Sequence, residues 1–173
     1  REPAALAAAK ARLAAEVDYH KAVQFFFYTQ WNALKAYANG HGIQLVGDIP
    51  IYVSPDSSDL WTRPELFQTD GAVHLTNVAG CPPDAFAADA TSIYDVVRID
   101  HFRGFESYYS IPAGNKTAAG GHWEKGPDRA FIDAMHKALG EGGIIAEDLG
   151  YLTPEVKTML AASGYPGMKI MQF

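Results

Sequence analysis

The sequence is almost devoid of cysteine. Cys81 is the only one among 173 residues, so no disulfide can form within the chain and a reducing compartment is the expected environment. We interpret Cys81 as an inert, half-buried thiol. Long hydrophobic runs are also missing, because Lys10 and Arg12 interrupt the Ala-rich stretch at residues 4–15 and no run approaches the ~20 residues of a membrane span. We therefore expect a cytoplasmic protein that does not contact a membrane.

Positive charge is scarce as well. The chain has 14 Lys and Arg against 20 Asp and Glu, which gives a net charge of -6, and its basic residues form no stripe. This balance argues against nucleic acid or anionic lipid as a partner and favours a neutral one. The hydrophobic fraction of 48% suits one compact domain with a sizeable core. Because the chain starts at Arg1 and stops at Phe173 within an apolar run, we expect it to be an excerpt.

The order of predicted elements is that of a parallel α/β fold. Apolar residues recurring at three and four predict a helix over 3–39, and Thr153 followed by Pro154 and Glu155 predicts a helix start, with Gly164 closing that helix. Residues 54–92 and 108–127 have little periodicity and are expected to be irregular. The remaining predicted elements are strands at 43–49, 95–100, 143–147 and 168–173 and a helix at 128–139.

One connection does not fit this alternation. Parallel neighbours need a crossover of a dozen or more residues that is usually helical, and no convincing helix lies between the strands that carry Asp48 and Asp100. A loop as long as 54–92 within a compact domain usually carries function or covers a site. Aromatic residues are frequent around the predicted strands and would suit the faces of sugars, although most such side chains are core: Tyr52, Trp61, Phe102, Phe105, Tyr108, Tyr109 and Trp123.

Two of the apolar runs end in an acid, Asp100 in one and Glu147 in the other. Parallel sheets bind ligands beyond the carboxyl ends of their strands, so both acids are candidate site residues. Either one alone could equally be a helix cap or half of an ion pair. The pair is more informative, because each acid has further ionisable neighbours, and such clusters are typical of functional sites.

The surroundings of the two acids predict different charge states. Arg98 and Asp100 are two apart on a strand and therefore share a face, so the guanidinium favours an ionised Asp100. Glu147 has no base in its own segment and is expected to keep its proton near neutrality. One charged and one protonated carboxyl are what glycoside chemistry requires, and a separation of about 5 to 5.5 Å would give retention through a covalent glycosyl enzyme.

Six short segments carry a further set of motifs, in order along the chain. They are 47–53 (Gly-Asp-Ile-Pro-Ile-Tyr-Val), 64–67 (Pro-Glu-Leu-Phe), 79–84 (Ala-Gly-Cys-Pro-Pro-Asp), 97–105 (Val-Arg-Ile-Asp-His-Phe-Arg-Gly-Phe), 145–150 (Ile-Ala-Glu-Asp-Leu-Gly) and 166–169 (Pro-Gly-Met-Lys). From about residue 17 to 173 they closely resemble the 4-alpha-glucanotransferase family, also called amylomaltases or disproportionating enzymes.

The resemblance implies a fold and an activity. The fold would be part of a (β/α)8 TIM barrel of the α-amylase superfamily, with the strands here being about the third to the sixth. Residues 1–173 would form a single partial catalytic barrel domain, with 54–92 as an inserted loop subdomain over the active site. The activity would be retaining transfer of α-1,4-glucan segments between maltooligosaccharides, or starch-derived glucans, as donor and acceptor, without cofactor or metal.

The same resemblance implies roles for individual residues. Asp100 matches the nucleophile, Glu147 the general acid/base and Arg98 the arginine that orients the nucleophile. Residues 80–86 match a flap over the acceptor side, where a second sugar would take the place of water. The residues matching those that contact sugar hydroxyls around the cleavage point are Asp48, His101 and Asp148.

The sequence also departs from the family pattern. A loop with a Gly-Asn-Pro turn and a tryptophan, followed by a helix, is expected between Asp84 and the Asp100 strand, but residues 89–92 run almost directly into that strand. The family's third acid would fall beyond Phe173, and its first two barrel strands are absent. Because a half barrel has open edges, we expect this chain by itself to be incomplete and inactive.

Two other interpretations remain open at this point. The missing third acid and the shortened loop are consistent with a non-catalytic glucan-binding or assembly fragment. A divalent-metal hydrolase using Asp100, His101, Glu147 and Asp148 is a further alternative, although the spacing of these residues matches no strong metal signature.

Overall fold

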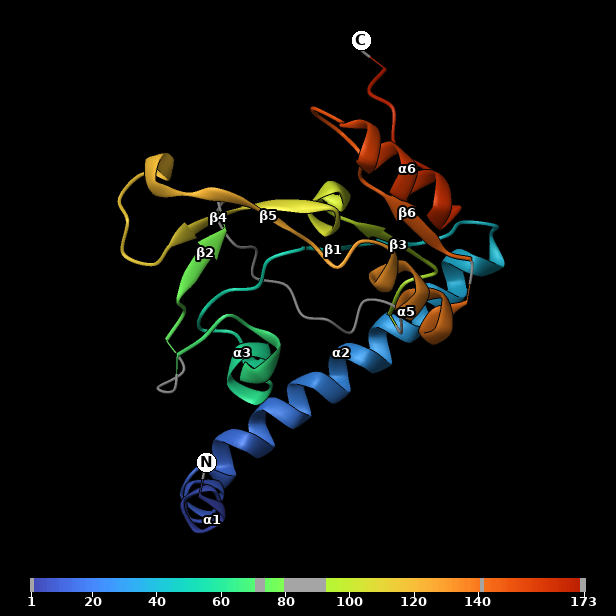
Figure 1. The fold of residues 1–173 in the computed structure, drawn as a ribbon. Helices are drawn as coiled ribbons and strands as arrows, with labels where there is room; N and C mark the ends of the chain where they lie inside the picture. Colours follow the sequence, from blue (N-terminus) through green and yellow to red (C-terminus); the bar gives the residue numbers. More distant parts are fainter. Residues whose placement is uncertain (1, 71–73, 80–92, 141, 172–173) are drawn as a thin grey trace. The chain divides into compact units, whose positions relative to one another are not determined.

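The computed structural model describes residues 2–70, 74–79, 93–140 and 142–171 (Figure 1). The chain forms two compact units, Arg1–Leu45 and Val46–Phe173, which we describe separately. Cys81 and the predicted flap at 80–86 lie outside the described residues. Within the described part, no helix combines the length and the hydropathy needed to cross a membrane.

The first unit is helical, as predicted for 3–39, but it contains two helices. The first helix, α1 (Pro3–Arg12), begins with a proline at its first position. Leu13 separates it from the second helix, α2 (Ala14–Gly40). Gly42, with φ of 74°, follows α2 in the left-handed conformation that commonly ends helices. Among the side chains of α2, Ala38 is buried, while large apolar side chains such as Phe26 are exposed.

The second unit contains a parallel sheet of β1 (Val46–Ile49), β3 (Val96–Ile99) and β6 (Ile144–Ala146), in the order β1-β3-β6. Both pairs are parallel, which confirms the α/β class and three of the predicted strands. The helices α5 (Arg129–Leu139) and α6 (Pro154–Ser163) also form where the sequence predicts them. Thr153 caps α6, and Gly164 ends it at φ of 70°.

The core of this unit joins the parallel sheet to both helices. Ile132 of α5 and Met159 of α6 pack with residues of β3, β6 and the segments that follow them. Phe105 stacks on Phe131 with ring centroids 3.7 Å apart. Burying this apolar cluster anchors the strands whose carboxyl ends carry Asp100 and Glu147. The buried members are Ile99, Phe102, Ile132, Ile144, Ala146, Met159 and Tyr165.

The expectation that 108–127 is irregular is wrong. Residues of this stretch form β4 (Ser107–Pro112) and β5 (His122–Lys125), which join β2 (Asn77–Ala79) from the 54–92 segment in an antiparallel sheet of the order β2-β4-β5. These strands are too short to show a clear alternation, and cross-strand contacts stabilise them instead. Tyr109 pairs with Trp123, and the Tyr108 hydroxyl donates to Glu124 at 2.9 Å. A 3-10 turn, η3 (Ala118–Gly120), lies between β4 and β5.

Short elements also occupy the long stretch at 54–92. Ser57 caps α3 (Ser58–Thr62) by accepting the Leu60 N–H at 3.2 Å, and η1 (Pro64–Leu66) follows. Thr69 and Leu75 form an isolated antiparallel bridge ahead of β2. With five residues, α3 is too short to serve as the usual helical crossover between β1 and β3.

The strand expected at 168–173 is not formed in its described part, 168–171. The segment before it does approach the sheet edge, because the Ala146 N–H of β6 donates to the Pro166 carbonyl at 2.9 Å. The Met168 N–H then donates to the Asp148 carboxylate at 2.6 Å. A backbone N–H that bonds to a side chain cannot also bond to a neighbouring strand, so strand pairing does not continue along this edge of the sheet.

Candidate active site

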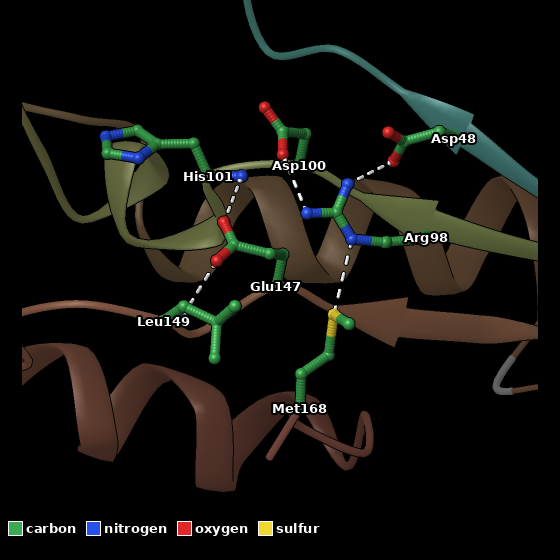
Figure 2. A network of polar contacts seen from close by, with 7 residues as sticks. All are labelled: Asp48, Arg98, Asp100, His101, Glu147, Leu149 and Met168. Carbon is green, nitrogen blue, oxygen red and sulfur yellow. Dashed lines mark hydrogen bonds and ion pairs between the residues drawn. The ribbon is translucent and has the colours of Figure 1, made fainter. Parts of the chain in front are cut away.

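Arg98 lies at the centre of a network of polar contacts at the carboxyl end of the parallel sheet (Figure 2). Its guanidinium contacts Asp48 at 2.6 Å and Asp100 at 2.9 Å, and its Nε donates to the Met168 sulfur at 3.2 Å. The register of β1 and β3 accounts for the first contact, because Asp48 is the direct cross-strand partner of Arg98. The sheet therefore brings together two acids that lie 52 positions apart in the sequence.

The surroundings of Arg98 favour its charged form. Partial burial opposes the charge, but the hydrogen bond with Asp48 and the negative charges of Asp48, Asp100 and Glu147 outweigh it and raise the pKa of Arg98 above its usual value. Glu147 thus belongs to the same electrostatic cluster as the two aspartates. A guanidinium that never loses its proton is a permanent partner for the Asp100 carboxylate.

Asp100 follows β3 directly and keeps the sheet pairing for one more residue, since its N–H donates to the Ile49 carbonyl at 3.0 Å. Its side chain lies on the Arg98 face of the strand, as the spacing of two predicts, and is 31% exposed. An anionic oxygen that is positioned by Arg98 and still reaches solvent is available to a ligand. These features are those of a nucleophile or a cation-stabilising group.

Glu147 follows β6 and is buried, with 9% of its surface exposed. One carboxylate oxygen accepts the His101 N–H at 2.8 Å and the other accepts the Leu149 N–H at 3.0 Å. Its own backbone continues the sheet, because its N–H donates to the Ile99 carbonyl and its carbonyl accepts the Phe102 N–H. The carboxyl group is therefore fixed by backbone on two sides, through contacts that the sequence did not predict.

His101 takes part in the site through its backbone N–H. It has φ of 46°, a left-handed conformation that is uncommon for residues other than glycine. The N–H groups of His101 and Phe102 both bond to Glu147, one to its side chain and one to its carbonyl. Figure 2 shows the imidazole directed away from the Arg98 and Asp100 pair. Strain at such a position is a common property of functional sites.

Asp148 points toward a different segment. It is 7% exposed, and one of its oxygens accepts the Met168 N–H at 2.6 Å. Gly167 packs so closely on the carboxylate that a Cβ there would lie 2.7 Å from one of its oxygens. Met168 in turn contacts Arg98, so Asp148 positions a residue that supports the Asp100 side of the site.

We expect Gly167→Ala to disturb the site although it leaves Asp100 and Glu147 unchanged. The added methyl group would displace the buried Asp148 carboxylate from the Met168 N–H, and overpacking with a lost hydrogen bond costs about 1–3 kcal/mol. Thermal unfolding of the full-length gene product should show this loss. Gly142→Ala is the matched control, because a Cβ at Gly142 meets no atom within 4 Å. Equal stability of the two variants would contradict the close contact.

The structure thus brings Asp48, Arg98, Asp100 and Glu147 into one cluster, with the backbone of His101 beside them. It places Asp148 behind this cluster, against Gly167 and Met168. The sequence interpretation missed the contributions of Met168 and of the Leu149 N–H, although the 166–169 motif was a signal for the first. Among the described residues, no group of three or more His, Cys, Asp or Glu side chains is arranged to hold a metal ion.

A parallel α/β unit with acids at the carboxyl ends of neighbouring strands, one paired with an arginine, is the architecture of an enzyme-type site at a strand-end crevice. The chain belongs to the 4-alpha-glucanotransferase family, whose model matches residues 1–91 and 88–173. It is 46% identical to the 4-alpha-glucanotransferase of Streptococcus pneumoniae and 40% identical to that of Thermus thermophilus. Both alignments cover all of this chain and 40% of the relative.

Solved structures agree with this assignment. The amylomaltase from Streptococcus agalactiae in complex with acarbose superposes with a TM-score of 0.90 at 39% identity, over 100% of this chain and 41% of that one. The amylomaltase from Corynebacterium glutamicum shares the fold, with a TM-score of 0.65 at 19% identity, over 83% of this chain and 24% of that one. The chain therefore spans about two fifths of the length of the two Streptococcus enzymes and of the Thermus thermophilus enzyme.

The comparisons also agree with the absence of the loop and helix that were expected between Asp84 and the Asp100 strand. The two matches to the family model meet at residues 88–91. The alignment with the Streptococcus pneumoniae enzyme runs over 201 positions against 173 residues here, so about 28 positions have no counterpart in this chain. The division between the two matches falls where the loop and helix before the Asp100 strand were expected.

Proposed function

We propose that this chain is the central part of a retaining 4-alpha-glucanotransferase, which moves α-1,4-glucan segments between maltooligosaccharides. The observation that carries the proposal is the pairing of Asp100 with Arg98 beside the buried, backbone-anchored Glu147. The family membership and the acarbose complex of a relative support α-glucans as the substrate class.

In this proposal the reaction has two displacements. An ionised Asp100 attacks the anomeric carbon, and Glu147 gives its proton to the departing glycosidic oxygen, so that a covalent glycosyl enzyme forms as the C–O bond to the leaving sugar breaks. Glu147 then takes the proton from a hydroxyl of an acceptor sugar. That oxygen attacks the anomeric carbon and releases the Asp100 carboxylate, which restores both groups.

The other residues of the cluster position these two. Arg98 orients Asp100 and balances its charge, and Asp48 holds Arg98 from the opposite strand. The peptide N–H groups of His101 and Leu149 fix both oxygens of Glu147, so that its position does not depend on side-chain rotation. Contacts of Asp48, His101 and Asp148 with sugar hydroxyls are part of the same proposal.

The isolated chain is proposed to be inactive. Three parallel strands are described here, whereas a closed (β/α)8 barrel needs eight, and the third acid that the resemblance implies lies outside the chain. We retain as predictions the single partial barrel domain, the covering role of 54–92 and a cytoplasmic location. No role for nucleic acid or membrane is proposed.

Incubation with maltotriose tests the function. The full-length gene product should convert maltotriose into both longer and shorter oligosaccharides, measured by chromatography, while the 173-residue chain should leave it unchanged. Binding of maltotriose by the full-length product without any new oligosaccharide would instead identify the non-catalytic glucan-binding alternative. Activity that disappears with EDTA and returns with a divalent cation would favour the metal-hydrolase alternative.

A further inference from the structure

One cavity in the Val46–Phe173 unit is lined by none of the residues of the Arg98 network. It has a volume of about 360 Å³ and is lined by residues that include Arg103, Glu106, Ser107, Trp123, Tyr151 and Glu155; we refer to it as the Trp123 pocket. This volume falls in the range of small-molecule sites, and the mixture of aromatic side chains with a few polar groups is typical of them.

The walls of the Trp123 pocket continue the two segments that hold Glu147. Arg103 lies two residues after His101, and Tyr151 lies two residues after Leu149, the residues whose N–H groups bind the two Glu147 oxygens. Arg103 Nη1 donates to the Tyr151 carbonyl at 2.9 Å and ties the two segments together. The pocket is therefore built on the two segments that support Glu147, the first of which directly follows Asp100.

The aromatic surface of this pocket is open but well fixed. Trp123 is 58% exposed and Tyr151 is 80% exposed. The Arg103 guanidinium stacks on the Trp123 ring at 4.7 Å from its centroid, and Tyr109 meets the same ring edge to face at 5.5 Å. A large ring supported in this way and left open to solvent offers a stacking surface at little entropic cost.

The charges around the pocket indicate a neutral ligand. The pocket lining contains one guanidinium, that of Arg103, and two carboxylates, those of Glu106 and Glu155. Hydrogen bonds from Lys125 and Ser107, against the effect of burial, lower the pKa of Glu106, so this acid is ionised at neutral pH. Lys125 neutralises Glu106, and Glu155 leaves Arg103 no surplus positive charge that would favour a phosphorylated ligand. Aromatic faces combined with polar groups suit the apolar faces and hydroxyls of a sugar.

We propose that the Trp123 pocket binds a glucose unit of the acceptor glucan, on the leaving-group side of the scissile bond. This rests on the proposed function, because Glu147 protonates the leaving oxygen and activates the acceptor hydroxyl, so a pocket built on its supporting segments lies on the side where both sugars sit. Trp123 and Tyr151 are the stacking residues, and Arg103 positions Trp123.

A donor without a sugar leaving group allows binding on the acceptor side to be tested separately from binding on the donor side. With α-maltotriosyl fluoride as donor and maltose as acceptor, Trp123→Ala in the full-length gene product should raise the KM for maltose about tenfold, while fluoride release without maltose keeps its wild-type rate. Tyr151→Ala, which retains the carbonyl that holds Arg103, should raise the same KM. Trp123→Phe should restore most of the affinity. His122→Ala removes a side chain that is 62% exposed on the same strand, β5, but does not line the pocket, and should leave the KM unchanged.

The outcomes distinguish the pocket from the function on which it rests. Wild-type transfer to maltose, together with an unchanged KM for maltose in both Trp123→Ala and Tyr151→Ala, would overturn the pocket and leave the function standing. An equal rise in His122→Ala, or an equal loss of fluoride release in Trp123→Ala, would also overturn it, since the effect would then not be specific to the acceptor. Absence of both fluoride release and transfer in the wild type would refute the function itself.

Discussion

Asp100→Asn abolishes glucan transfer in the full-length gene product and leaves the fold intact: this is the first result that we expect. The amide has the shape of the carboxylate but no negative charge, so it forms no glycosyl ester and stabilises no oxocarbenium-like transition state. Loss of a covalent nucleophile lowers turnover by about 10³-fold or more. Initial rates on maltotriose measure the effect, and circular dichroism with thermal unfolding checks the fold.

The fold should survive because Arg98 keeps another partner. Its contact with Asp48 at 2.6 Å does not involve Asp100, and the Asp100 side chain is partly exposed rather than enclosed in the core. An exposed or half-exposed ion pair contributes about 1 kcal/mol or less, so the unfolding temperature should change little.

Asp48→Asn is the matched control for this experiment. It removes the same charge from the same guanidinium, but from the neighbouring strand and from a residue to which we assign no covalent role. We expect a loss of activity much smaller than that of Asp100→Asn. Turnover near the wild-type level in Asp100→Asn, or equal losses in the two variants, would reject Asp100 as the nucleophile.

The strand-end acids could be predicted from the sequence because their signal is local. Buried parallel strands are short apolar runs, and the residue that follows such a run lies at the carboxyl edge of the sheet, as Asp100 and Glu147 do. The shared face of Arg98 and Asp100 likewise needs only the alternation of a strand, and the structure confirms that contact.

The remainder of the site depends on pairing between distant segments. Asp48 contacts Arg98 because the register of β1 and β3 places them opposite each other, and no local pattern sets that register. One donor to Glu147 comes from the turn after β3, where His101 adopts a left-handed conformation that its residue type does not predict, and only the other, Leu149, lies in the same segment as Glu147. The β4 and β5 strands were missed for a related reason, since cross-strand contacts such as Tyr109 with Trp123 stabilise them.

Glu147→Gln gives the other large effect that we expect, and the effect should depend on the leaving group. The sugar released from a glucan is a poor leaving group that must be protonated, so loss of the general acid should slow glucan transfer by about 10²–10⁴-fold. An activated aryl glucoside leaves without protonation, so its first step should be slowed far less. Rates of both substrates, measured on the same preparation of the full-length gene product, give the comparison.

The structure adds a complication that this comparison resolves. Both oxygens of Glu147 accept backbone N–H groups, from His101 at 2.8 Å and from Leu149 at 3.0 Å. Glutamine has one oxygen, so its NH₂ group would face one of these donors, and a buried donor left unpaired costs about 1–3 kcal/mol. That disturbance changes the position of the side chain for every substrate, and it lowers the unfolding temperature. Loss of the proton donor acts on the poor leaving group alone, so equal slowing of the glucan and the aryl glucoside would mean that Glu147 is a structural residue and not the acid.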